Sequence, residues 1–136
     1  MTPPRFELRL APSTANVAAL LDALEEFAAE AALPGAITGR LILLAEELAA
    51  NVVMHGAGAG YFALSGEAGA GGLRLVFEDD GPAFDPRAGP PADAGAALEA
   101  RAVGGMGLHL IQTLARDARY ERSAGRNRLS FRLGAE

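Results

Sequence analysis

Apolar and polar residues alternate with two different periods along this chain, and these periods predict its strands and helices. Near the amino terminus, Phe6, Leu8 and Leu10 alternate with charged residues. A period of two is typical of a strand with one buried face. We therefore expect an edge strand here.

Two helices are predicted next. Ser13 or Thr14 offers a helix start, and apolar residues then recur at helical spacing as far as Ala31, opposite acidic residues. The pair 34–35, proline and glycine, ends this helix. A second helix is predicted over Thr38–His55, and because it is apolar on nearly all sides we expect it to be buried on most of them.

The remainder of the chain predicts four more strands, one more helix and a long connection. The strands are expected at Tyr61–Ser65, Leu73–Glu78, Arg119–Ser123 and Arg128–Leu133, with turns at Glu67–Gly72 and Ala124–Asn127 and a helix at Gly107–Ala118. The segment Asp85–Gly104 is rich in proline, glycine and alanine, which is typical of a mobile lid, with a short helix around Ala94–Ala102. This order predicts helices on one face of a mixed sheet.

Composition indicates one globular domain over residues 1–136, because half of the residues are apolar and 21% are charged. The net charge is -5 and the arginines are scattered, which argues against nucleic acid as a direct partner. There is no cysteine and there are only two histidines, so disulfides and zinc clusters are not expected. The amino terminus lacks a long apolar segment, so we expect no membrane span and a cytoplasmic protein.

The absence of lysine excludes several chemistries. All 12 basic residues are arginine. A P-loop, an ordinary protein kinase and a Schiff-base enzyme each need a lysine amine. Any nucleotide chemistry in this chain must therefore use another design.

Polar residues interrupt the second predicted helix at four-residue steps. Glu47, Asn51 and His55 share one stripe of that helix, and buried polar groups are costly unless they are partnered. A carboxamide oxygen completed by phosphates and waters suits magnesium. The alternative is a helix edge that faces solvent, which is the interpretation we give to Glu46.

Two glycine-containing segments are further candidates. Asp79 and Gly81 follow a strand, where a carboxylate can accept a hydrogen bond from a ligand amine and a glycine allows close approach. The segment Gly104–Leu108 precedes a helix, so its amides can hold phosphate. Taken separately, the first is also compatible with an ordinary acidic turn, and the second with a lid hinge that binds nothing.

Taken in order, three segments resemble the N box and the two glycine boxes of GHKL ATPases: Glu47–His55, Asp79–Phe84 and Gly105–Leu108. The short chain, without a dimerisation helix or transducer domain, looks like the anti-sigma-factor serine/threonine kinases of that superfamily. The resemblance implies a Bergerat-type two-layer α/β sandwich. Its mixed, mostly antiparallel sheet would be covered on one face by helices, with an ATP lid at about 85–104.

The resemblance also implies residue roles. Glu47 would be the catalytic general base and Asn51 a ligand of Mg²⁺ in the ATP site. Asp79 would accept the adenine amino group, and Gly81 would shape the adenine pocket. The phosphates would contact Gly105, Gly107 and the amide of Leu108.

The function implied is that of an ATP-dependent serine/threonine protein kinase that acts as an anti-sigma factor. Its partners would be an anti-sigma-factor antagonist, which it phosphorylates, and a sigma factor or another regulatory target. The kinase would be a homodimer. Ala83 departs from the family pattern, which has a glycine there, and Arg101 in the lid is a weaker phosphate candidate. The alternatives are a non-catalytic nucleotide-binding interaction module, or an ATPase that controls another process.

Overall fold

The computed structural model describes residues 3–87 and 110–134. In these residues it has the elements β1 (Arg5–Leu10), α1 (Thr14–Glu30), α2 (Gly35–His55), β2 (Phe62–Gly69), β3 (Gly72–Asp79), β4 (Arg116–Ser123) and β5 (Arg126–Leu133). Residues 110–114 are also helical. None of the helices within the two described ranges is long and apolar enough to cross a membrane.

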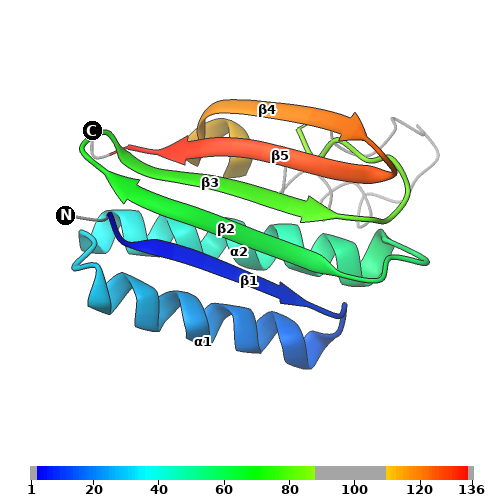
Figure 1. Cartoon of the computed structure of the whole chain (residues 1–136), viewed down its shortest axis with the longest axis horizontal. Helices are drawn as coiled ribbons and strands as arrows, with labels where there is room; N and C mark the ends of the chain where they lie inside the picture. The colour runs from blue at the N-terminus through cyan, green and yellow to red at the C-terminus, as the bar shows by residue number, and fades with distance from the viewer. Residues whose placement is uncertain (1–2, 88–109, 135–136) are drawn as a thin grey trace.

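The five described strands form one sheet in the order β1-β2-β3-β5-β4. Every pairing among them is antiparallel, so these strands supply no parallel pair for the mixed sheet that was expected. The position of β1 at one edge confirms the prediction for the first strand. Figure 1 shows both long helices against the same face of the sheet, as the two-layer prediction required.

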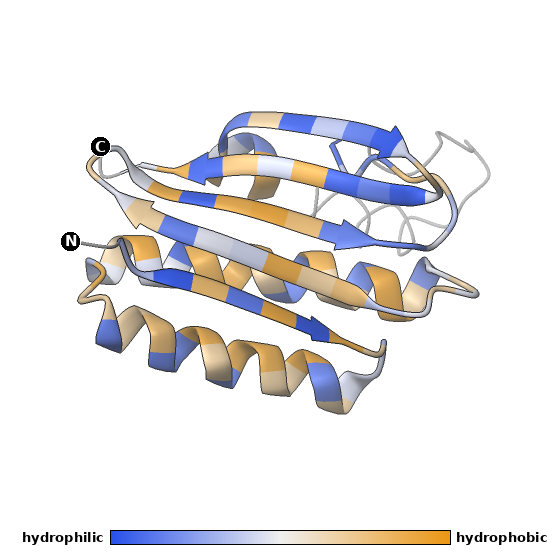
Figure 2. Cartoon of the chain, in the orientation of Figure 1, coloured by the Kyte–Doolittle hydropathy of each residue, from blue (hydrophilic) through white to orange (hydrophobic). Residues whose placement is uncertain are grey.

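The core lies between the helical layer and the inner face of the sheet. Each strand alternates along its length, so every second side chain points toward the helices. The largest fully buried side chains come from both layers and are Phe62, Leu20, Leu24, Leu41, Leu44, Leu64, Leu73 and Leu133. The hydropathy colouring in Figure 2 shows the same alternation along the strands.

The first helix begins where the sequence predicts. Ser13 is the N-cap, and its side-chain oxygen accepts a hydrogen bond from the Asn16 amide at 3.0 Å. This bond satisfies one of the amides that a helix start leaves without a partner. α1 packs on α2 and on β1, which fixes the edge of the helical layer.

The second helix differs from the prediction in its start and in its burial. It begins at Gly35, directly after Pro34, and not at Thr38. Leu43 is 49% exposed and Met54 is 62% exposed, so the expectation that this helix is buried on most sides was wrong. With the sheet on one side and α1 on another, α2 keeps an outward side that no described element covers.

Two predicted boundaries are also corrected. The helix expected over Gly107–Ala118 ends earlier, because the described helical residues stop at 114 and β4 begins at Arg116. Arg116 pairs with Arg132 of β5, and a bulge separates it from Arg119. Pairing with β5 therefore overrides the local helical tendency of these residues.

The hairpins are tighter than predicted. β2 ends at Gly69 and β3 begins at Gly72, so a two-residue turn joins these strands. Another two-residue turn, Ala124 and Gly125, joins β4 to β5. Ala124 and Gly125 both have positive φ, 53° and 74°, which is the mark of a type I′ turn. A turn of this type matches the twist of the two strands it connects.

The outer face of the sheet is charged. Strand alternation brings arginines that are scattered in the sequence to this face, but acidic residues lie among them. Arg128 is 3.3 Å from a Glu78 carboxylate oxygen, and Arg5 is 3.9 Å from that of Glu67. The Arg5–Glu67 pair is exposed and adds little stability, whereas Glu78 is only 15% exposed. Both pairs interrupt any continuous basic stripe. The exclusion of nucleic acid stays a prediction.

We predict that Gly72→Ala destabilises the protein strongly. Gly72 has a φ of +114°, and a Cβ there would overlap the carbonyl oxygen of Leu133. We expect unfolding by urea to report a loss of about 2–3 kcal/mol. The matched control is Gly71→Ala, because a Cβ at Gly71 meets nothing within 4 Å. Equal unfolding midpoints for the two variants would contradict this account of the β2–β3 turn.

Candidate nucleotide-binding site

The turn that follows β3 is organised around the carboxylate of Asp79. One of its oxygens, Oδ1, accepts hydrogen bonds from the Gly81 amide at 2.9 Å and from the side-chain amide of Asn127 at 3.0 Å. Within the described part of the chain, Oδ2 has no hydrogen-bond partner. Asp79 also lines a cavity, and a carboxylate oxygen without a partner can accept a hydrogen bond from a donor on a ligand.

Gly81 is a glycine because the turn packs tightly. A Cβ at this position would lie 3.1 Å from the Asp79 carboxylate, 3.3 Å from the Ala59 methyl and 3.5 Å from the Gly56 Cα. Gly81 is buried, and it brings the turn against the end of α2. The role of Gly81 in shaping an adenine pocket stays a prediction.

Ala83 fits this turn without backbone strain. The non-glycine residues with positive φ in the described chain are Ala32, Asp117 and Ala124, so residue 83 does not need the conformational freedom of glycine here. Ala83 lines the cavity. Its departure from the family pattern therefore places a methyl group against the ligand space and leaves the turn itself unstrained.

Asp80 fastens the other side of the turn. Its Oδ1 accepts hydrogen bonds from the amides of Gly60 and Tyr61, at 2.7 and 3.1 Å. Burial on its own raises the pKa of Asp80, but these two hydrogen bonds, together with its own backbone amide and the charge of Arg126, lower the pKa below its ordinary value. The end of β3 is thus tied to the loop between α2 and β2.

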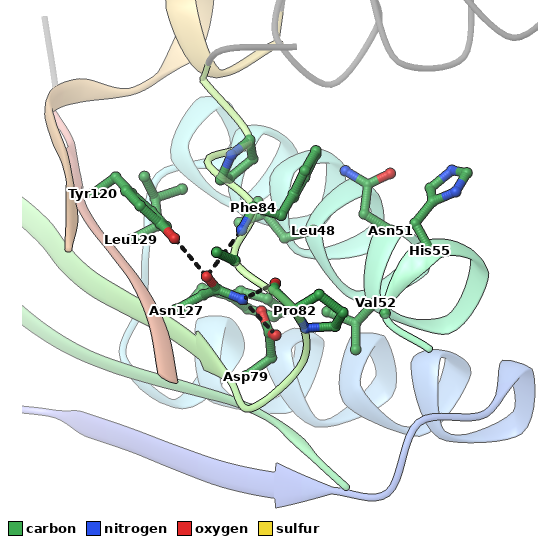
Figure 3. A pocket seen from close by; sticks show the side chains of 14 residues that line it. Leu48, Asn51, Val52, His55, Asp79, Pro82, Phe84, Tyr120, Asn127 and Leu129 are labelled. Atoms are coloured by element: carbon green, nitrogen blue, oxygen red, sulfur yellow. Dashed lines mark hydrogen bonds between the residues drawn. The ribbon is translucent and has the colours of Figure 1, made fainter. Parts of the chain in front are cut away.

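The cavity lies between α2 and the sheet and encloses about 160 Å³. Its apolar walls come from both layers, with Leu48 and Val52 on the helix and Phe77 and Leu129 on the strands. Its polar groups are Asn51, His55, Asp79, Tyr120 and Asn127. Figure 3 shows Asn51 and His55 projecting from α2 on one side, with Asp79 and Asn127 on the other. Apolar walls with a few polar groups are typical of small-molecule sites.

Three of the residues predicted on α2 lie together as expected. Asn51 and His55 line the cavity, and Glu47 lies one helical turn before Asn51, outside the set of lining residues. Burial raises the pKa of Glu47, and the nearby Glu46 carboxylate raises it further, while a hydrogen bond from Asn51 and the charge of His55 oppose this. The structure therefore contains the half-buried carboxylate next to a carboxamide that the sequence predicted, formed by Glu47 and Asn51.

Asn127 is a site residue that sequence reasoning missed. It is the buried polar residue of the core, with 5% exposure, and it joins β5 to the turn after β3. Its side-chain amide donates to Asp79 and, at 2.8 Å, to the Pro82 carbonyl oxygen. The signal was present, because Arg126 and Arg128 on either side face outward, so residue 127 had to point inward.

Several predicted features lie outside the described residues. They are Gly105, Gly107 and Leu108, the helix around Ala94–Ala102, and Arg101. The first residues of the expected lid are described: Arg87 pairs with Asp85 at 2.9 Å and donates to the Ala118 carbonyl oxygen at 3.0 Å. Among the described residues, no group of three or more His, Cys, Asp or Glu side chains could hold a metal ion. The role of Asn51 as a Mg²⁺ ligand stays a prediction.

The histidine kinase-like ATPase domain family matches residues 10–133, which include every predicted site residue. The chain belongs to this family. Membership implies ATP binding, and it confirms the superfamily that the three sequence segments indicated. No curated protein matches the chain.

One solved structure shows the same fold. The structure of the RsbU and RsbW domains of Rv1364c from Mycobacterium tuberculosis has a TM-score of 0.70 and 17% identity, and the match covers 98% of this chain and 33% of that one. The chain therefore spans about a third of that protein's length. The histidine kinase domain from Erythrobacter litoralis EL346 blue-light activated histidine kinase has a TM-score of 0.49 and 20% identity, over 88% of this chain and 59% of that one.

We predict that the pKa of the Glu47 carboxyl is raised from the ordinary value of a glutamic acid, because burial disfavours its charged form. In Asn51→Ala the pKa should rise further, since the hydrogen bond that stabilises the carboxylate is lost. Carboxyl-carbon NMR over a pH series measures both values. An unchanged pKa in Asn51→Ala would contradict the Glu47–Asn51 contact.

The same shift predicts a pH dependence of stability. The folded protein holds the Glu47 proton more tightly than the unfolded chain does, and this difference stabilises the folded state. The stabilisation is fully present below the unfolded-state pKa. It is lost as the pH rises through the folded-state pKa. Relative to Glu47→Gln, the unfolding free energy of the wild-type protein should therefore fall from about pH 4 upward. A difference between the two proteins that stays constant from acid to neutral pH would contradict it.

Proposed function

We propose that this protein is an ATP-dependent serine/threonine protein kinase that phosphorylates an anti-sigma-factor antagonist and also acts as an anti-sigma factor. The main observation behind this proposal is that one cavity is lined by polar residues from both the sheet and α2. The Asp79 carboxylate, with one oxygen free of described partners, lies on the sheet wall, and Asn51 lies on the helical wall beside Glu47.

The sheet wall fits an adenine ring. Phe77 and Leu129 offer apolar surface for the ring faces, and Asp79 Oδ2 can accept a hydrogen bond from the exocyclic amine. Ala83 narrows the same space with its methyl group. An ionised carboxylate cannot donate a hydrogen bond to the carbonyl oxygen of an oxo-purine. This wall therefore favours a purine with an amino group at that position.

The helical wall fits the phosphate end of the nucleotide. Asn51 would hold Mg²⁺ through its carboxamide oxygen, and bound Mg²⁺ would neutralise phosphate charge. Glu47, with its raised pKa, would take the proton from the serine or threonine hydroxyl of the partner. We propose the phosphate contacts of Gly105, Gly107 and Leu108 on sequence resemblance.

The likeness to the Mycobacterium tuberculosis structure supports this choice among the functions of the family. That structure contains a domain named RsbW and covers nearly the whole of this chain at a TM-score of 0.70. At 17% identity the likeness concerns the fold, so the sigma factor, the antagonist and the homodimer are proposals.

Two alternative functions make different demands on Glu47. An interaction module that binds nucleotide without chemistry does not need a proton acceptor at this position, whereas transfer to a hydroxyl does. An ATPase would release free phosphate in the absence of a protein acceptor. Retention of Glu47 in a half-buried environment, next to Asn51, favours transfer over binding alone.

We predict that the wild-type protein binds ATP and that Asp79→Asn weakens binding at least about tenfold, because a charged acceptor for the adenine amine is lost. Calorimetric titration of ATP, with and without Mg²⁺, measures this. The matched control is Asp117→Asn, which removes a carboxylate that is 70% exposed and lies outside the cavity. An absence of ATP binding by the wild-type protein would overturn the proposed function.

We predict that Glu47→Gln abolishes phosphorylation of the partner while ATP affinity is kept, because the proton acceptor is lost and the adenine wall is untouched. The assay follows transfer of the ATP γ-phosphate to purified anti-sigma-factor antagonist proteins. Glu46→Gln is the control, since it removes the adjacent, exposed carboxylate. Equal transfer by Glu47→Gln and wild type would remove Glu47 from the mechanism, and phosphate release without any acceptor would favour the ATPase.

A further inference from the structure

We propose that the β4–β5 hairpin positions the nucleotide-binding carboxylate, and that Tyr120 does this by holding the side chain of Asn127. Tyr120 and Asn127 would be positioning residues, acting on the ligand through Asp79. This inference rests on the proposed binding of an amino-purine nucleotide in the cavity.

Asn127 stands at the centre of five hydrogen bonds that fix which way its amide points. Its Oδ1 accepts from the Tyr120 hydroxyl at 2.5 Å, from the Phe84 amide at 3.1 Å and from Arg122 at 3.2 Å. Its Nδ2 donates to Asp79 at 3.0 Å and to the Pro82 carbonyl oxygen at 2.8 Å. Figure 3 shows this arrangement around Asn127.

A reversed amide would be unfavourable at this position. It would place the Asn127 nitrogen against the Phe84 N–H and the Arg122 guanidinium, which are both donors. It would also place the oxygen against a carboxylate and a carbonyl, which are both acceptors. At 5% exposure, water cannot easily replace the lost partners. The orientation of Asn127 is therefore set by the groups around it.

This orientation has a direct consequence for Asp79. The Asn127 amide and the Gly81 amide both bond Oδ1, so the carboxylate is held by one oxygen. The other oxygen, Oδ2, is left for a donor in the cavity. The binding group is thus arranged before the ligand arrives, which lowers the cost of binding.

Tyr120 is the hairpin residue whose effect can be tested most cleanly. Its ring lines the cavity, and its hydroxyl donates to Asn127. Arg122, which is exposed, also donates to the Gly81 carbonyl oxygen at 2.7 Å, so its removal would disturb the turn directly. Tyr120→Phe keeps the ring wall and removes only the hydroxyl that holds Asn127.

The chain provides a matched control, because it contains only two tyrosines. The hydroxyl of Tyr61 donates to Glu78 at 2.5 Å, and neither residue lines the cavity. Tyr61→Phe therefore removes the same group from a site that the proposal does not involve. Its ATP affinity should equal that of the wild type.

The first experiment is a calorimetric titration of wild type, Tyr120→Phe and Tyr61→Phe with Mg²⁺ and either ATP or purine riboside 5′-triphosphate, which lacks the 6-amino group. We expect Tyr120→Phe to weaken ATP binding about three- to tenfold, because one hydrogen bond of the network is lost. Binding of the purine analogue should be unchanged, since it makes no bond to Asp79.

If Tyr120→Phe lost equal affinity for both nucleotides, the proposal would be overturned. That result would mean that Tyr120 acts by contacting the nucleotide directly and not by positioning Asp79. Unchanged ATP affinity in Tyr120→Phe would overturn it as well. If the wild-type protein binds no ATP, the proposed function fails first, so the two failures are distinguishable.

A second variant tests Asn127 without creating a cavity. Asn127→Asp has the same shape, but it places a second carboxylate within hydrogen-bond distance of Asp79 Oδ1. Two adjacent carboxylates hold a shared proton at low pH and repel each other when both are ionised. ATP affinity of this variant should improve as the pH falls from 8 to 5, relative to wild type. A pH profile parallel to that of wild type would contradict the positioning role.

Discussion

The hydrogen bond between the Asn127 amide and the Asp79 carboxylate joins two strands at the point where the sheet opens into the cavity. β3 ends at Asp79, and its neighbour β5 begins one residue before Asn127. Without this bond a buried carboxamide and a carboxylate would each lose a partner in an apolar setting, which is costly. The turn between β3 and the helical layer is therefore arranged by polar contacts inside an otherwise apolar core.

The layer arrangement explains why the site lies where it does. The helices cover one face of the sheet, so the ends of β3 and α2 meet at the rim of the core. At this rim Gly81 packs closely, and a Cβ there would lie 3.1 Å from the Asp79 carboxylate and 3.3 Å from the Ala59 methyl, so these neighbours would have to shift. The backbone there is held from two sides, by Asp80 toward the loop after α2 and by Asn127 toward β5. The turn after β3 and the helix α2 therefore face each other across the cavity. This arrangement suits a nucleotide whose base would bind at the turn and whose phosphates would bind at the helix.

Much of this arrangement could be predicted from sequence, because the period of the pattern and the turn residues are local signals. The cap at Ser13 and the shared stripe of Asn51 and His55 are such cases. The start of β4 at Arg116 could not be predicted, since pairing with β5 decides it. Alternation with Arg126 and Arg128 indicates that Asn127 points inward, but its partners on β3 and β4 become visible only with the strand register.

The most direct test of the central claim is a crystal structure of the protein with Mg²⁺ and a non-hydrolysable ATP analogue. The account predicts the adenine amine within hydrogen-bond distance of Asp79 Oδ2, with the Asn127 amide still on Oδ1. It also predicts the metal ion at the Asn51 carboxamide oxygen. A nucleotide bound away from the cavity, or an adenine amine that contacts another group, would contradict it.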